Sequence, residues 1–273
     1  MSSFFEEKPD LLLAVNGAEE TLQIILAMRE DEDEPYRMLE ARSLIVPGRS
    51  VNFLIPSIRD SLNLFGCTPS DITRLALTAG PGSFTGLRLT FSAIAGIMSG
   101  ITAENKGLVA DMEYLPVLAR GAAQTSGLPV WTITHSRRMQ VYLQGFDPLG
   151  PEDITPKPIT PPLPVSVHEA AQVIDSYGQD KAAVTGTGIR KNSTFFDGFL
   201  TDNPGLLVMP ERFNTPAPED IIMAASHAAY GREMPMPMYL RGSDAEENLA
   251  EITGKRGIPL DEAKKRIAHI TPR

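Results

Sequence analysis

Apolar positions in the first fifty residues predict a group of strands. Two short apolar runs, 11–15 and 22–28, are separated by Asn16-Gly17, a dipeptide that is typical of a tight hairpin turn. The acidic segment 30–34 that follows is typical of a solvated turn, and a third strand candidate ends at residues 43–46. The sequence therefore predicts that the chain opens with three strands that can pair in an antiparallel arrangement.

After residue 50 the hydrophobic period changes to that of amphipathic helices, in which apolar residues recur every three or four positions. The first such stripe consists of Val51, Leu54, Ile58, Leu62 and Phe65. A strand is expected over residues 71–78, with its apolar run at 75–77. A second helix is expected from about Ser83, with an apolar stripe formed by Phe84, Leu87, Phe91, Ile94 and Met98. Strands and helices that alternate in this way favour an α/β fold with a mixed sheet.

The alternation continues to about residue 240. Residues 148–164 contain seven prolines, which fix the backbone and remove hydrogen-bond donors, so this segment is expected to be a loop or linker. No fixed-period internal repeat is visible. We expect two lobes, 1–110 and 111–241, the second of which carries the proline-rich insertion, and a polar C-terminal extension over 242–273. Further strands are expected at 107–110, 129–134, 140–146 and 182–185, and further helices at 113–123, 167–176 and 220–230.

Composition argues against several classes of protein. The 25 Lys and Arg residues against 34 Asp and Glu give a formal net charge of −9, which disfavours independent binding to nucleic acid. The single cysteine, Cys67, precludes an intramolecular disulfide and fits a reducing compartment. The apolar stretch between Arg88 and Glu104, which carries no charge, is shorter than the roughly 20 apolar residues of a membrane span. We therefore expect a cytoplasmic protein that does not enter a membrane.

Residues of the common catalytic and metal sites are not grouped in this sequence. The four histidines are widely separated, and Cys67 has no CxxC partner, so neither pattern predicts a zinc site. The sequence also lacks the G-x-S-x-G elbow of many hydrolases. We expect no catalytic residue, no metal and no cofactor in this chain.

One loop lies between a predicted strand and a predicted helix, where backbone N–H groups can bind an anion. It consists of Gly80, Pro81, Gly82, Ser83, Phe84, Thr85 and Gly86, and Arg88 follows it in the helix. Its spacing is neither that of a Walker loop nor that of a dinucleotide fingerprint. The glycines and the proline can also serve a structural turn in which Ser83 caps the helix. The residues favour the structural interpretation and leave anion binding open.

The stretch from residue 80 to residue 97, GPGSFTGLRLTFSAIAGI, resembles the signature of the TsaB (YeaZ) family. Ser136-Arg137-Arg138-Met139-Gln140-Val141-Tyr142 resembles the D-A-R-x-x-E-V-Y segment of that family. Leu11 to Leu26 corresponds to the first hairpin of the family, and Ser50 to Leu62 corresponds to the helix before the signature. Two later landmarks of the family correspond to Gly186-Thr187-Gly188 and Pro237-Met238-Tyr239-Leu240-Arg241. The resemblance covers about residues 10–241.

This resemblance implies the two-lobed, actin-like and ribonuclease-H-like α/β fold of the ASKHA superfamily, with mixed sheets flanked by helices. It also implies a non-catalytic subunit that binds and activates TsaD, the enzyme that transfers threonylcarbamoyl to the adenosine beside the tRNA anticodon. A TsaE-like ATPase would complete the assembly, and tRNA would be met only through the complex. In the family the helices of the first lobe pair with TsaD or with a second copy of the subunit.

The expected contact surface is formed by the two first-lobe helices. Small residues in the second helix lie away from its main apolar stripe and allow another helix to approach closely. The alternative is that these small residues pack against a neighbouring helix of the same chain. The expected partner-binding residues are Val51, Leu54, Ile58, Leu62, Ala93, Gly96 and Gly100.

The sequence also departs from active relatives of the superfamily. Those proteins place an Asp at the end of the first strand to hold a nucleotide-bound metal, and Asn16 stands at that position here. Glu19 and Glu20 in the next turn would repel a phosphate. A histidine that TsaB relatives often carry corresponds to Ser50, and His135 replaces the Asp of the D-A-R segment. A free-standing ATPase or phosphotransferase on the same fold is the main alternative, and a peptidase is a weaker one.

Overall fold

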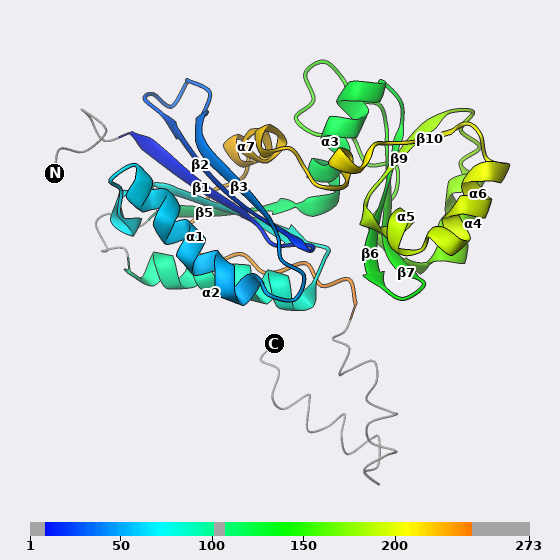
Figure 1. Cartoon of the computed structure of the whole chain (residues 1–273). Coiled ribbons are helices and arrows are strands. Elements are labelled where there is room, and N and C mark those ends of the chain that lie inside the picture. The colour runs from blue at the N-terminus through cyan, green and yellow to red at the C-terminus, as the bar shows by residue number, and fades with distance from the viewer. Residues whose placement is uncertain (1–8, 101–106, 242–273) are drawn as a thin grey trace, which may run out of the picture. The chain divides into compact units, whose positions relative to one another are not determined.

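The computed structural model describes residues 9–100 and 107–241, and Figure 1 shows the arrangement of their elements. The chain divides into two compact units, Met1–Met238 and Tyr239–Arg273, and all the helices and strands named below lie in the first. None of the described helices combines the length and the apolar character that a membrane crossing requires. The extension predicted over 242–273 lies outside the described residues.

The first sheet has the strand order β3-β2-β1-β4-β5. Its first three strands pair in an antiparallel arrangement, as predicted, whereas β1, β4 and β5 run parallel. Because β1 and β4 are covered on both faces, they are almost continuous apolar runs. The strands are β1 (Asp10–Asn16), β2 (Thr21–Arg29), β3 (Arg37–Ile45), β4 (Arg74–Gly80) and β5 (Leu108–Glu113).

Helices cover the two faces of this sheet, and Figure 1 shows α1 and α2 together on one of them. The apolar stripes of α1 (Ser50–Leu64) and α2 (Phe84–Gly100) pack on alternate side chains of β1, β2 and β4. The remaining side chains of these strands pack against α3 (Tyr114–Ser126) and α7 (Pro218–Ser226) on the other face. We call the first sheet with α1, α2 and α7 the first lobe.

The second sheet has the strand order β10-β9-β6-β7-β8, and its core surrounds the buried Trp131. We call this sheet, with its helices, the second lobe, and α3 contacts strands of both sheets. The strands are β6 (Val130–Arg137), β7 (Gln140–Phe146), β8 (Leu163–Ser166), β9 (Ala182–Thr185) and β10 (Leu206–Val208). The helices are α4 (Val167–Ser176), α5 (Thr187–Lys191) and α6 (Ser193–Asp202).

The two sheets are built on the same plan. In each, two antiparallel pairings lead outward from the first strand on one side, and two parallel pairings lead outward on the other. A helix connects the third and fourth strands of each sheet, and the loop after the fourth strand is rich in glycine. The α/β architecture with two mixed sheets flanked by helices confirms the predicted fold class.

Several local predictions differ from the structure. The proline-rich segment is not a loop up to Pro164, because Leu163 and Pro164 belong to β8; this is an edge strand, where the missing N–H of a proline is tolerated. The last helix ends at Ser226 rather than at Tyr230, and the chain then turns so that Gly231 pairs with Val109. The short elements α5, α6 and β10, and the 3-10 turns Pro69–Asp71 and Glu211–Asn214, were not predicted.

The end of the first unit returns to the first lobe after the second sheet is complete. Helix α7 packs on the first sheet. After it, the N–H of Met238 donates to the carbonyl of Ala79, and Met234 and Met238 pack against the core beneath α1 and α2. The lobe boundaries predicted at residues 110 and 241 stay predictions.

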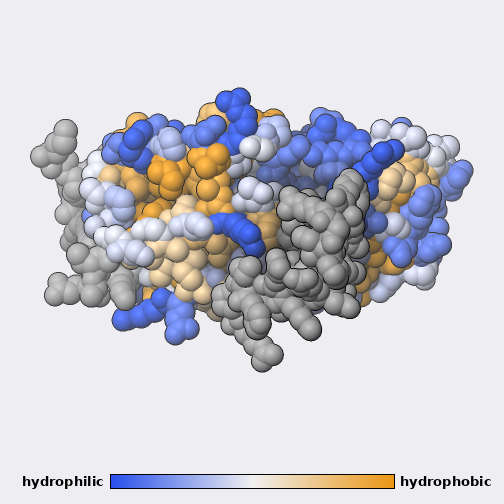
Figure 2. Space-filling model, turned by 90° about the horizontal axis from the view of Figure 1, so that it is seen from below, coloured by the Kyte–Doolittle hydropathy of each residue, from blue (hydrophilic) through white to orange (hydrophobic). Residues whose placement is uncertain are grey.

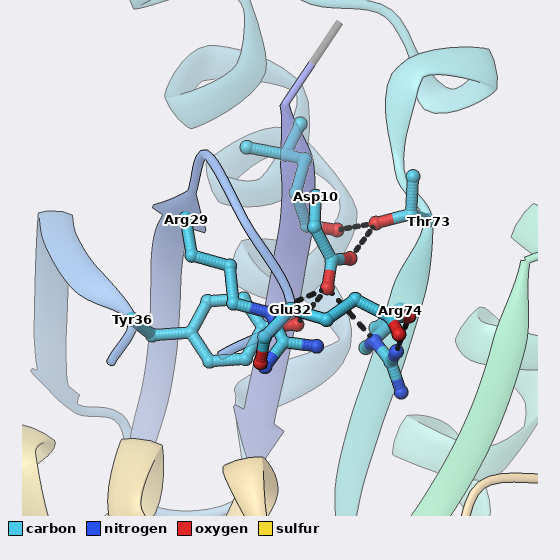
Figure 3. Close-up of polar contacts among 7 residues, drawn as sticks. Asp10, Arg29, Glu32, Tyr36, Thr73 and Arg74 are labelled. Atoms are coloured by element: carbon cyan, nitrogen blue, oxygen red, sulfur yellow. Dashed lines mark hydrogen bonds and ion pairs between the residues drawn. The ribbon is translucent and has the colours of Figure 1, made fainter. Parts of the chain in front are cut away.

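A polar cluster joins the start of β1 and β4 to the end of β2 (Figure 3). It lies at the ends of these strands that are opposite to Asn16. Asp10 Oδ2 accepts from Arg29 Nε at 2.7 Å, from Arg74 Nε at 3.0 Å and from the hydroxyl of Tyr36 at 2.7 Å. The hydroxyl of Thr73 donates to its other oxygen. Partial burial acts to raise the pKa of Asp10, but hydrogen bonds from these neighbours outweigh it and hold the pKa below its ordinary value.

We expect Asp10→Asn to destabilise the protein by about 2–3 kcal/mol at neutral pH, because it removes the carboxylate that two largely buried arginines share and leaves Arg74 paired only with the exposed Glu32. Since the folded-state pKa is lowered, this stabilisation is present above the ordinary pKa of 3.8 and is lost as the pH falls through the folded value. Urea unfolding at pH 7 and pH 3 would show the difference shrinking in acid. Glu32→Gln is the control, since that side chain is 84% exposed, and an equal loss in both variants would contradict the expectation.

Candidate functional site

The first candidate site lies where β1 and β4 end side by side, an edge at which parallel sheets commonly bind ligands. Asn16, the last residue of β1, donates from Nδ2 to Oε1 of Gln23 at 2.8 Å. Its Oδ1 accepts from the N–H of Ala18 at 3.1 Å and from the hydroxyl of Thr78 at 3.0 Å. Both polar atoms of the Asn16 side chain are therefore used to build the β1–β2 turn.

The signature loop packs tightly against that same turn. It begins with a cis peptide bond between Gly80 and Pro81, and the N–H of Ser83 donates to the carbonyl of Ala18 at 2.6 Å. A Cβ at Gly82 would overlap the backbone of Ala18, and one at Gly86 would overlap the carbonyl of Gly17. Glycine is required at these two positions because backbone meets backbone.

The start of α2 uses its own N–H groups. The hydroxyl of Ser83 accepts from the N–H of Gly86 at 3.2 Å, and the N–H of Leu87 donates to the carbonyl of Ser83. Arg88 lies over the ring of Phe84, with its guanidinium carbon 3.8 Å from the ring centre. These contacts favour the structural interpretation of the loop over anion binding, with Ser83 as the cap that the sequence predicts.

Two acidic residues of the β1–β2 turn contact the second lobe. The carboxylate of Glu19 accepts from the hydroxyl of Thr187, the first residue of α5, and from the hydroxyl of Tyr114 at 2.9 Å. Beside it, Nζ of Lys191 lies 2.5 Å from Oε1 of Glu20. The acidic turn thus makes hydrogen bonds and an ion pair with the glycine-rich segment that follows β9.

The electrostatics of this junction follow from burial. Desolvation raises the pKa of Glu19 above its ordinary value, although the hydrogen bonds from Thr187 and Tyr114 act in the opposite direction. The buried hydroxyl of Tyr114 has a pKa well above 10.0, because of desolvation and of the nearby Glu19 carboxylate. Desolvation and the charge of Lys191 lower the pKa of His135. Burial at this junction therefore disfavours the ionised forms of Glu19, Tyr114 and His135.

A raised folded-state pKa means that Glu19 contributes stability below its ordinary pKa of 4.5, and that this contribution is lost as the pH rises through the folded value. We expect Glu19→Gln, which keeps the shape and the acceptor, to be more stable than the parent at pH 7.5 and to lose this advantage near pH 4.5. Urea unfolding at both pH values measures the effect. The control is Glu34→Gln, an exposed carboxylate of the acidic segment 30–34 that follows β2, and an advantage of Glu19→Gln that grows in acid would contradict the sign.

The second candidate site is an apolar groove on the outer surface of α1 and α2. Hydrophobic residues gather on this face of the first lobe (Figure 2). The groove has a volume of about 620 Å³ and is lined by Ile55, Pro69, Ser70, Leu89, Ser92, Ala93, Gly96, Ile97 and Gly100. Among the described residues, a Cβ at Gly96 or Gly100 would meet no atom within 4 Å, so neither glycine packs against a described helix of the same chain.

The structure places the seven predicted partner-binding residues in two different environments. Ala93, Gly96 and Gly100 line the groove, although Ala93 is itself largely buried, and Val51 is 65% exposed on α1 without lining the groove. Leu54, Ile58 and Leu62 are buried in the core of the first lobe instead. Their assignment to a partner surface is corrected, because the sheet already covers the stripe that these three residues form.

Sequence analysis missed other residues that line the groove. Ile55 is 51% exposed, and Leu89 and Ile97 line the opposite side on α2. Val51 and Ile55 are separated by one helical step of four residues, a spacing that marks a second apolar line beside the core stripe. In the described parts of the chain, no group of three or more His, Cys, Asp or Glu residues is placed to hold a metal ion.

Comparison with protein families finds a match to part of the chain. The family model for TsaD, tRNA N6-adenosine threonylcarbamoyltransferase, matches residues 48–156, a segment that includes α1, the signature loop and α2. No curated protein sequence matched the chain significantly.

Solved structures resemble almost the whole fold. An uncharacterized protein from Pseudomonas aeruginosa, with similarity to peptidase YEAZ, has a TM-score of 0.63 at 22% identity, over 85% of this chain and 100% of that one. YeaZ from Pseudomonas aeruginosa has a TM-score of 0.62 at 21% identity, with the same coverage. At these identities the likeness establishes the fold. Together with the family match, it confirms the resemblance to the TsaB (YeaZ) family that the signature stretch predicts.

Proposed function

We propose that the chain is a TsaB-type interaction subunit, which binds and activates a TsaD-like transferase through the outer surface of α1 and α2. The observation that carries this proposal is the open groove, in which Gly96 and Gly100 have free space above them and apolar side chains form the walls. Small residues at such a position allow the backbone of a partner helix to approach closely.

The exposed side chains of α1 support the same surface. Val51 is 65% exposed and Ile55 is 51% exposed, and full burial of a side chain of this kind is worth about 1.5–3 kcal/mol. A partner that covers both would gain a useful part of the free energy of a micromolar complex, about 8 kcal/mol. Contiguous apolar surface of this kind commonly marks a protein–protein contact.

The edge formed by β1 and β4 supports a non-catalytic role. Asn16, where active relatives of the superfamily have a metal-binding Asp, uses its amide in the β1–β2 turn. Glu19 extends from the same turn to Thr187, so a carboxylate stands between the two lobes, where it would repel a phosphate. These contacts disfavour the alternative of a free-standing ATPase or phosphotransferase.

We propose further partners from the family resemblance. A TsaE-like ATPase would join the complex, and two copies of this chain would pair through the same α1–α2 surface when no TsaD-like protein is present. At a net charge of −9, tRNA would be held mainly by cations of the partners.

Size-exclusion chromatography of this chain mixed with the TsaD-like protein of the same organism tests the proposal. We expect one peak that contains both proteins at micromolar concentration, and two separate peaks would contradict the proposal. Calorimetry of the isolated chain with Mg-ATP tests the alternative. We expect no heat of binding, and a saturable isotherm would support the enzymatic function instead.

A further inference from the structure

One turn of the first lobe, residues 17–20, contacts two loops that hold equivalent places in the duplicated plan of the sheets. On one side, Ala18 accepts from the N–H of Ser83 in the loop after β4. On the other, Glu19 accepts from the hydroxyl of Thr187 at the start of α5, directly after β9. The turn therefore lies between the loop after β4 and the glycine-rich segment after β9.

The contact to the second lobe is a chain of hydrogen bonds that ends on a carboxylate. The N–H of His135, in β6, donates to the hydroxyl of Thr187 at 3.1 Å, and that hydroxyl donates to Oε1 of Glu19. The second oxygen of Glu19 accepts from the buried Tyr114 of α3. Two separate elements, α5 and α3, thus direct hydroxyl donors to one carboxyl group.

The segment around Thr187, residues 186–188, packs closely against β6 of the second lobe. Gly186 has a φ of 118°, and its N–H donates to Oδ1 of Asn214 at 2.8 Å. A Cβ at Gly186 or Gly188 would collide with the backbone of Ile133. Because the backbone of this segment packs directly on β6, its bond to Glu19 links the second lobe to the first.

We propose that Glu19 is an internal ligand: its carboxyl group accepts the hydrogen bonds of Thr187 and Tyr114 at the junction of the two lobes and holds that junction closed. The ion pair between Lys191 and Glu20 lies beside this contact and reinforces it. The proposal concerns the junction and does not depend on the partner surface of α1 and α2.

Hydrogen exchange of the full chain tests the proposal. In Glu19→Ala we expect amide exchange in residues 186–192 to rise by about tenfold or more, while α1 and α2 exchange as in the parent. Sodium formate supplies the missing carboxylate and is expected to reverse the rise, whereas sodium chloride at the same ionic strength is not. Glu19→Gln, which keeps the acceptor, is expected to exchange as the parent does.

Thr187→Val removes the donor from the other side of the bond and serves if Glu19→Ala does not fold. The matched control is Thr201→Val, because that hydroxyl bonds only within α6 among the described contacts, to the carbonyl of Asp197. Unchanged exchange at 186–192 in folded Glu19→Ala or Thr187→Val would overturn the proposal. So would a rise of the same size throughout β6 and β7, or a rise that formate does not reverse.

Discussion

Gly96→Arg is expected to weaken binding to the TsaD-like protein by about 100-fold or more while the isolated chain stays folded. Gly96 is exposed in α2, and a side chain there would point into space that none of the described residues occupies, so it displaces none of them. A long charged side chain would instead fill the groove that a partner helix needs. Calorimetry or surface plasmon resonance measures the affinity, and circular dichroism measures the melting temperature.

The second lobe offers a matched control for this variant. Gly198 is also an exposed glycine inside a helix, α6, and a Cβ there would meet no atom within 4 Å. Replacement of glycine by arginine inside a helix favours the helix by about 0.8 kcal/mol, so neither variant should be less stable than the parent. Gly198→Arg should bind the partner normally. Equal binding by both variants would remove Gly96 from the contact surface.

Gly82→Ala is expected to destabilise the isolated protein by about 3 kcal/mol or more, and to lower its melting temperature by about 6–12 °C. The added Cβ would overlap the backbone of Ala18, which cannot rotate away as a side chain can. Thermal and urea unfolding measure the loss. The effect should be independent of phosphate, since the loop serves to pack the β1–β2 turn.

Gly96→Ala is the control for this effect, because it adds the same methyl group where no atom lies within 4 Å. It should leave the stability unchanged or raise it slightly. If Gly82→Ala were as stable as the parent and phosphate stabilised only the parent, the loop would be an anion site and the structural interpretation would be wrong.

The first lobe could be predicted well from sequence because its periods are regular. The apolar runs of β1 and β2 and the stripes of α1 and α2 follow single patterns over many residues, so their positions agree closely with the structure. In the second lobe, β10 has three residues and α5 has five, too few to establish any period. The shared plan of the two sheets was hidden for the same reason, since no residue pattern repeats with it.

The candidate sites show what a linear pattern leaves undetermined. Leu54 and Ile55 are adjacent in sequence, yet one is buried under the helix and the other faces outward, and only packing against the sheet decides which. The partners Glu19 and Thr187 are separated by 168 positions. From sequence, Glu19 indicated only repulsion of phosphate, whereas the fold supplies the hydroxyl groups that bind its carboxylate.

The most direct test of the account is hydrogen exchange of this chain with and without the TsaD-like protein of its organism. We expect new protection in residues 50–64 and 84–100, the two helices that border the groove. Protection confined to the second lobe, or a stable complex in which both helices exchange as in the free chain, would contradict the proposed contact surface.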